Sequence, residues 1–304
     1  MPPADGGIPG GGMLRLFLLP LLVVAIGMAI VAIVSLASGA RRTPEECLRD
    51  LKSADPSRRG AAAYDLAQIL ARPGEGERLR RDPAFRRALE AALGAGAKSG
   101  WIRIYLVDAL SAIGDPASAP ALRRVLDDGD AEAAAHAAIA LGRLADLGSL
   151  EALIGMSRHA DARRRKAAVY ALRAFIAPAA AARLKEALAD SVPGVGWNAA
   201  LSLSHLGDPA AVLALESMLD RARLAAMRIP PAPGAASAPM SAAETDEILA
   251  AAAAGAARLR APALRPALER LVASDPSARV RDAARRALEA EGREKKSKVP
   301  SPKS

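Results

Sequence analysis

Apolar positions recur with a helical period along most of the chain. Leu122, Val125 and Leu126 stand at i, i+3 and i+4, and Leu215 with Met218 begins the same spacing further on. Each such helix carries one apolar stripe, which it cannot cover by itself. Neighbouring helices must therefore pack against one another. The pattern predicts an all-α fold.

The helical pattern repeats along the chain. Leu110, Leu141, Leu172 and Leu203 are spaced by 31 residues, and Gly-Asp-Pro occurs in register at 114–116 and 207–209. Gly ends one helix, Asp supplies an N-cap oxygen for the next, and Pro suits the first helical turn. Each repeat is therefore predicted to be an antiparallel helix hairpin. We expect the hairpins to stack into a right-handed α-solenoid.

The expected solenoid covers residues 43–291. A repeat lies near its start, and another follows a Pro/Ala-rich insertion at 222–243, which we expect to be a loop. Residues 280–288 are expected to form a terminal capping helix. Residues 292–304 contain several lysines among Ser and Pro, a composition typical of a basic disordered tail.

The N-terminal segment predicts one transmembrane helix at residues 14–38. Leu16 to Ala37 is a run of 22 residues without a charge, long enough to cross a bilayer. Residues 1–13 are rich in Gly and Pro, and we expect a disordered tail there. Because more Lys and Arg follow the span than precede it, we expect a single-pass protein with a cytoplasmic soluble domain. Small residues at 38–40 leave a cleaved signal peptide as the alternative, which would give a secreted or periplasmic protein.

Composition supports the helical prediction and limits the chemistry only weakly. Hydrophobic residues make up 51% of the chain but aromatic residues only 3%, as expected for a helical rather than a sheet protein. The formal net charge of +9 permits binding to nucleic acid or anionic lipid without requiring it. The single cysteine, Cys47, excludes an intramolecular disulfide.

Two sequence segments and the repeat period resemble a known family. Val280 to Leu288 (VRDAARRAL), Ala109 to Pro116 (ALSAIGDP) and the 31-residue period resemble the short HEAT repeats of the HEAT-like family named after phycobilisome lyases. The resemblance extends over residues 43–291. It implies an α-solenoid and says little about activity, because such repeats serve scaffolds, adaptors and a few enzymes.

The family includes a di-iron hydroxylase whose metal ligands are paired His-Glu dipeptides. Here His136, His159 and His205 are each followed by Ala or Leu, and Cys47 has no nearby His. We therefore expect no catalytic residue, no metal, no cofactor and no enzymatic activity. An enzyme or enzyme accessory related to the HEAT-repeat lyases and hydroxylases remains the alternative. Trp101 and Trp197 each open the first helix of a repeat. We expect both side chains to anchor helix packing, with an aromatic pair that binds a ligand as the alternative.

A candidate binding surface follows from the expectation that the second helices of the repeats line the concave face. Its exposed positions form the charged row, namely Arg123, Arg124, Lys185, Glu186, Glu216, Glu269 and Arg270. The mixed sign of the charged row favours a protein or peptide partner over nucleic acid, which would need successive basic residues. Binding of nucleic acid through the basic tail remains a further alternative. The sequence thus predicts a membrane-anchored scaffold or adaptor that binds a protein or peptide on its concave surface.

Overall fold

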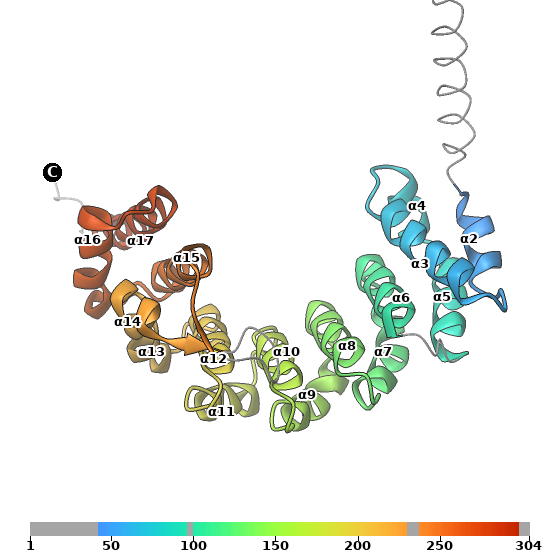
Figure 1. Ribbon diagram of the computed structural model, residues 1–304, viewed down its shortest axis with the longest axis horizontal. Coiled ribbons are helices and arrows are strands. Elements are labelled where there is room, and N and C mark those ends of the chain that lie inside the picture. The colour runs from blue at the N-terminus through green and yellow to red at the C-terminus, as the bar shows by residue number, and fades with distance from the viewer. Residues whose placement is uncertain (1–41, 96–99, 230–236, 298–304) are drawn as a thin grey trace, which may run out of the picture.

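The computed structural model describes residues 42–95, 100–229 and 237–297. They form an arc of stacked helix hairpins (Figure 1). The inner layer of the arc contains α3 (Pro56–Leu70), α6 (Gly100–Ile113), α8 (Ala131–Leu144), α10 (Ala162–Leu172), α12 (Pro193–His205), α15 (Ala242–Leu259) and α17 (Ala278–Ser297). The outer layer contains α5 (Pro83–Gly94), α7 (Ala119–Leu126), α9 (Leu150–Met156), α11 (Pro178–Ala187), α13 (Val212–Met218) and α16 (Arg265–Ser274).

Shorter elements join or flank the two layers. Helix α2 (Pro44–Asp50) packs on α3, and α4 (Glu75–Arg80) connects α3 to α5. Helix α14 (Arg221–Ala226) follows α13. The 3₁₀ turns η1 (Pro116–Ser118), η2 (Leu147–Ser149), η3 (Pro209–Ala211) and η4 (Pro262–Leu264) each lead into an outer helix.

The turn chemistry predicted from the sequence is confirmed. Asp115 and Asp208 accept hydrogen bonds from the amides of Ala117 and Ala210, both at 2.9 Å, and a proline follows each cap. The glycine before each Asp has a φ above 70°, a conformation that suits glycine and ends the preceding helix. The Gly-Asp-Pro sequence therefore turns the chain from an inner to an outer helix.

The 31-residue leucines form the centre of the core. Leu110, Leu141, Leu172 and Leu203 are each fully buried, and they belong to one continuous apolar cluster that extends from α2 to α17. The inner helices approach closely because their contact residues are small. A Cβ added at Gly142 would lie 2.9 Å from the Cα of Ala171 on the next inner helix. Helices with such small contacts can occupy the inside of a curved stack.

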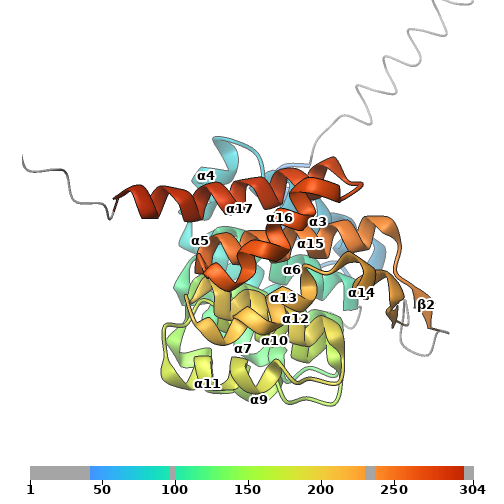
Figure 2. The same ribbon diagram turned by 90° about the vertical axis from the view of Figure 1, so that its left-hand side faces the viewer.

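The insertion at 222–243 differs from the loop that we expected. Its described part contains most of α14 and two short strands, β1 (Arg228–Ile229) and β2 (Ala238–Pro239), which pair antiparallel. Asp220 caps α14 by accepting from the amide of Arg223 at 3.0 Å. Helix α14 and β2 lie at one edge of the solenoid (Figure 2). The insertion is therefore partly structured, and this ribbon is a small departure from an all-α fold.

The C-terminal end of the solenoid differs from the expected boundary. Helix α17 continues to Ser297, so the segment expected as a disordered tail begins with helix. The predicted transmembrane segment 14–38, like residues 1–13 and 298–304, lies outside the described residues. Within 42–95, 100–229 and 237–297, no helix combines the length and hydropathy needed to cross a bilayer.

Candidate functional site

The charged row does not lie where we expected it. Its seven residues belong to α7, α11, α13 and α16, and these helices form the outer, convex side of the arc (Figure 1). The expectation that second helices line the concave face is therefore wrong for this chain. The first helices take that place because their small contact residues allow the closest packing.

Several members of the charged row already have partners within the solenoid. Arg123 pairs with Asp146 at 2.8 Å, and Lys185 pairs with Asp208 at the same distance. Asp146 and Asp208 are N-cap residues of the next turn along the chain, so both pairs join successive elements.

The acidic members of the row are held in a similar way. Glu186 contacts Arg158 at 3.2 Å and Arg183 at 3.0 Å, and Glu269 contacts Arg265 at 2.9 Å. The remaining members, Arg124, Glu216 and Arg270, are exposed on the convex side. Much of the charged row thus serves the solenoid itself.

The concave face is formed by the inner helices, each of which has one side free of packing. An outer helix covers one side, and neighbouring inner helices cover the flanks. The remaining positions recur with the repeat; they are 101, 108 and 112 on α6, 132, 139 and 143 on α8, 163, 170 and 174 on α10, and 194, 201 and 205 on α12. Together with their equivalents on α3, α15 and α17, these positions form the inner surface.

The inner layer carries every tryptophan and tyrosine of the chain. The five residues are Tyr64, Trp101, Tyr105, Tyr170 and Trp197, and they lie on α3, α6, α10 and α12. None of them is buried. The two described phenylalanines are almost fully buried in the core instead. The aromatic residues with a polar atom are therefore segregated onto the inner layer.

Three of these aromatic side chains form a cluster at the N-terminal end of the inner surface. Tyr105 makes edge-to-face contacts with Tyr64 and Trp101, with ring centroids 5.7 and 6.0 Å apart. Trp101 lies directly over Gly60, where an added Cβ would collide with the indole ring. Even so, 48% of Tyr64 and 47% of Trp101 remain exposed. The cluster is a fixed aromatic surface open to solvent.

Polar contacts connect the inner helices across this surface. His136 on α8 hydrogen-bonds Asp108 on α6 through Nδ1 at 2.7 Å, and Glu132 on α8 lies 3.8 Å from Arg163 on α10. The hydrogen bond to Asp108 raises the pKa of His136, against the opposing effect of burial, and the charges of Asp108 and Glu132 add to the rise. His136 is therefore a structural link between repeats.

Basic residues gather at the carboxyl ends of four inner helices. Arg143 and His205 lie in the last turns of α8 and α12, Arg173 is the C-cap residue of α10, and Arg258 lies in the last turn of α15. Arg173 stacks over Tyr170, with its guanidinium carbon 3.9 Å from the ring centroid. Because the inner helices run in the same direction, these four residues share one edge of the inner surface. They are called the basic rim.

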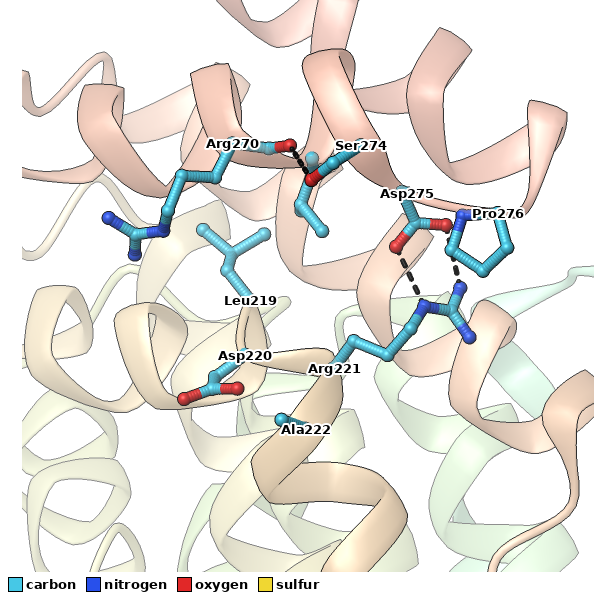
Figure 3. Close-up of a pocket in the computed structure, with 9 residues that line it drawn as sticks. Leu219, Asp220, Arg221, Ala222, Arg270, Ser274, Asp275 and Pro276 are labelled. Atoms are coloured by element: carbon cyan, nitrogen blue, oxygen red, sulfur yellow. Dashed lines mark hydrogen bonds and ion pairs between the residues drawn. The ribbon is translucent and has the colours of Figure 1, made fainter.

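A small pocket lies between α14 and α16, away from the inner surface (Figure 3). Its main charged group, Arg221, forms two hydrogen bonds with Asp275, at 2.7 and 2.8 Å, and also contacts Asp246. Since the guanidinium is already held by carboxylates, the arrangement joins α14, α15 and α16. The pocket is a structural joint between the insertion and the last repeats.

Metal-ligand side chains and the single cysteine were the remaining candidates for chemistry in the described residues. No group of three or more His, Cys, Asp or Glu side chains in the described ranges is placed to hold a metal ion. Cys47 is buried, and burial is the main cause that raises the pKa of its thiol to about 11. A thiol with that pKa is a poor nucleophile near neutral pH.

Stacked hairpins with a 31-residue period define an α-solenoid repeat protein. Residues 86–173 and 151–229 match the family described as HEAT repeats, so this part of the solenoid is built from HEAT-like repeats. No curated protein matches the sequence.

Two solved structures are similar to this chain over most of its length. YibA from E. coli is 16% identical with a TM-score of 0.51, and the alignment covers 86% of this chain and 85% of YibA. The complex of CpcE and CpcF of phycocyanin lyase from Nostoc sp. PCC7120 is 20% identical with a TM-score of 0.52, covering 83% of this chain and 94% of the matched chain. At these identities the similarity shows the fold alone.

Proposed function

We propose that this protein is a membrane-anchored HEAT-repeat scaffold that binds a protein or peptide partner on its inner, concave surface. The observation that carries the proposal is the segregation of every Trp and Tyr onto the inner layer without burial. Large amphipathic aromatic side chains are enriched at binding hot spots, because they bury much area with little loss of conformational entropy. A solenoid also offers one continuous surface built from several repeats.

The proposed activity is binding without catalysis. Two side chains that could take part in catalysis support that view. Cys47 is buried in the core, which raises the pKa of its thiol, and His136 is hydrogen-bonded to Asp108 on the neighbouring helix. Both side chains are therefore engaged within the solenoid. The hydroxylase version of the enzyme alternative would need a set of metal ligands, and no such set lies together among the described residues.

Binding to the inner surface can be tested by co-purification from detergent-solubilised membranes. We expect a reproducible partner of the full chain to be lost from the variant Tyr64→Ala, Trp101→Ala, Tyr170→Ala. The control variant Arg124→Ala, Glu216→Ala, Arg270→Ala changes three exposed residues of the convex side and should retain it. Thermal unfolding of both variants separates loss of binding from loss of fold. If both variants retained the partner equally, binding on the inner surface would be refuted.

The membrane anchor is proposed from the uncharged run between Leu16 and Ala37. Alkaline extraction of membranes should leave the full chain in the pellet and release a chain that lacks residues 14–38. Release of the full chain would contradict the anchor and favour signal cleavage. Proteolysis of sealed membranes with a tag after Ser304 then tests the proposed cytoplasmic side.

A further inference from the structure

We infer that the partner of the inner surface is a peptide segment in which acidic residues flank apolar ones. This inference rests on the proposed function and adds the chemistry of the partner. It follows from two adjoining features of the inner surface, an apolar stripe along its middle and the basic rim along one edge.

The apolar stripe follows one position of the repeat. Ile139, Tyr170 and Leu201 occupy equivalent sites on three successive inner helices, and Trp197 lies one helical turn before Leu201. All four are partly exposed. A bound segment could therefore bury apolar side chains against several repeats at once, which is the main source of binding energy at such surfaces.

The basic rim borders this stripe, and its charge is not neutralised within the described part of the chain. Arg143, Arg173 and Arg258 form no ion pair with any carboxylate among the described residues. Within the described residues, Arg173 donates a hydrogen bond to the hydroxyl of Tyr170, and Arg258 donates one to the backbone carbonyl of Ala254.

The convex side gives the contrast. There, Arg86 pairs with the N-cap residue Asp115 at 2.9 Å, as Arg123 and Lys185 do with theirs. At the basic rim the helix carboxyl ends contribute a partial negative charge of about half an elementary charge each. A full positive charge per arginine exceeds it. Carboxylates of a partner would complete the neutralisation.

The shape and chemistry of the surface favour a peptide over other anionic partners. A bilayer is too flat to enter the inside of the arc (Figure 1). On the same surface Asp108 and Glu132 pair with His136 and Arg163, so these basic groups are already engaged and do not form the continuous row of free cations that the phosphates of a nucleic acid would need. A peptide can place apolar side chains on the stripe and carboxylates on the basic rim at the same time.

Selection from a displayed library of short random peptides tests the inference with the full chain in detergent. We expect the enriched peptides to combine Asp or Glu with Leu, Phe or other large apolar residues. By fluorescence anisotropy, a selected peptide should bind the variant Arg143→Glu, Arg173→Glu, Arg258→Glu at least about tenfold more weakly than the unchanged chain. The control Arg124→Glu, Arg270→Glu reverses charge on the convex side and should bind like the unchanged chain.

Three outcomes would overturn the inference. The first is that the library yields neutral or basic peptides. The second is that the inner and the convex charge variants lose affinity for the selected peptide equally. The third is that an oligo-dT probe binds the chain more tightly than any selected peptide does. The last would indicate nucleic acid as the partner. If a cellular partner still depends on the inner aromatic residues while reversal of the basic rim has no effect, the proposed function stands and only the acidic chemistry fails.

Discussion

Two buried arginines join successive repeats. Arg164 on α10 donates through Nη1 to the carbonyl of Leu126 at 3.0 Å and through Nη2 to the carbonyl of Asp128. Arg183 on α11 donates to the hydroxyl and the carbonyl of Ser157, at 2.7 and 2.8 Å. Each guanidinium thus donates to carbonyls at the carboxyl end of an outer helix, where the backbone acceptors have no donor within the helix.

Replacing Arg164 by Ala should destabilise the protein strongly. The change removes buried hydrogen bonds and leaves two carbonyls without a donor, so we expect a loss of about 2–4 kcal/mol in the free energy of unfolding. Chemical denaturation of the full chain measures it. Arg163→Ala is the matched control, because Arg163 is exposed on the same turn and its removal should change stability little. Similar effects of the two variants would contradict the structural role of Arg164.

A pH-dependent contribution is expected from His136. Its pKa is raised in the folded chain, chiefly by the hydrogen bond to Asp108, so the charged form stabilises the fold below the unfolded pKa of about 6.5. That stabilisation is lost as the pH rises through the folded pKa. His136→Gln should therefore cost about 0.5 kcal/mol at pH near 5.5 and less at pH near 8.5. Urea unfolding at both pH values, with the exposed His205→Gln as control, tests this; a cost that grows with pH would contradict it.

At the scale of elements, the contact between α8 and α10 determines how closely the inner layer packs. Gly142→Ala would place a methyl group 2.9 Å from both the Cα and the Cβ of Ala171. Overpacking should outweigh the gain in helix propensity, with a net loss of about 1–2 kcal/mol. Gly155→Ala on α9 is the control, since nothing lies within 4 Å of the added carbon. The control should raise the free energy of unfolding by about 0.5–1 kcal/mol, measured by thermal unfolding of both variants. If Gly142→Ala were also more stable than the unchanged chain, the close approach of α8 and α10 would be refuted.

The repeats and their turns could be predicted because they depend on residues close in sequence. The buried leucines at a 31-residue spacing and the Gly-Asp-Pro turns are local patterns. The direction of curvature is not local, since it depends on which layer packs more closely. Contacts such as Gly142 with Ala171 decide this, and the charged row was therefore placed on the wrong side.

The structured insertion shows the same limit. Arg221 reaches Asp275, which is 54 residues further along the chain, and no spacing rule predicts such a pair. The inner aromatic residues leave a stronger signal in the sequence. Trp101 and Trp197 open the first helices of their repeats, and Tyr170 falls in register with Leu201. Alignment of Trp101, Tyr105, Tyr170 and Trp197 to the 31-residue period places these four residues on first helices, and hence in one shared layer. Tyr64 lies out of this register, so its place in the inner layer is known from the structure alone.

On the scale of the whole molecule, the two sides of the arc have different roles. Polar pairs join one repeat to the next on both sides, but only the concave side also carries unburied Trp and Tyr residues and the basic rim. The described part of the chain thus combines an outer layer in which many charges are paired within the solenoid with an inner surface suited to a partner. The proposed anchor would confine that partner to the membrane.

Site-specific photo-crosslinking in cells tests the central claim most directly. A photoreactive amino acid is placed in the full chain at Glu132 or Lys166 on the inner layer, and at Arg124 or Glu216 on the convex side; all four side chains are exposed. Binding on the concave face predicts a discrete covalent adduct of the same protein from both inner positions and none from the outer ones. Adducts from the outer positions alone would contradict it.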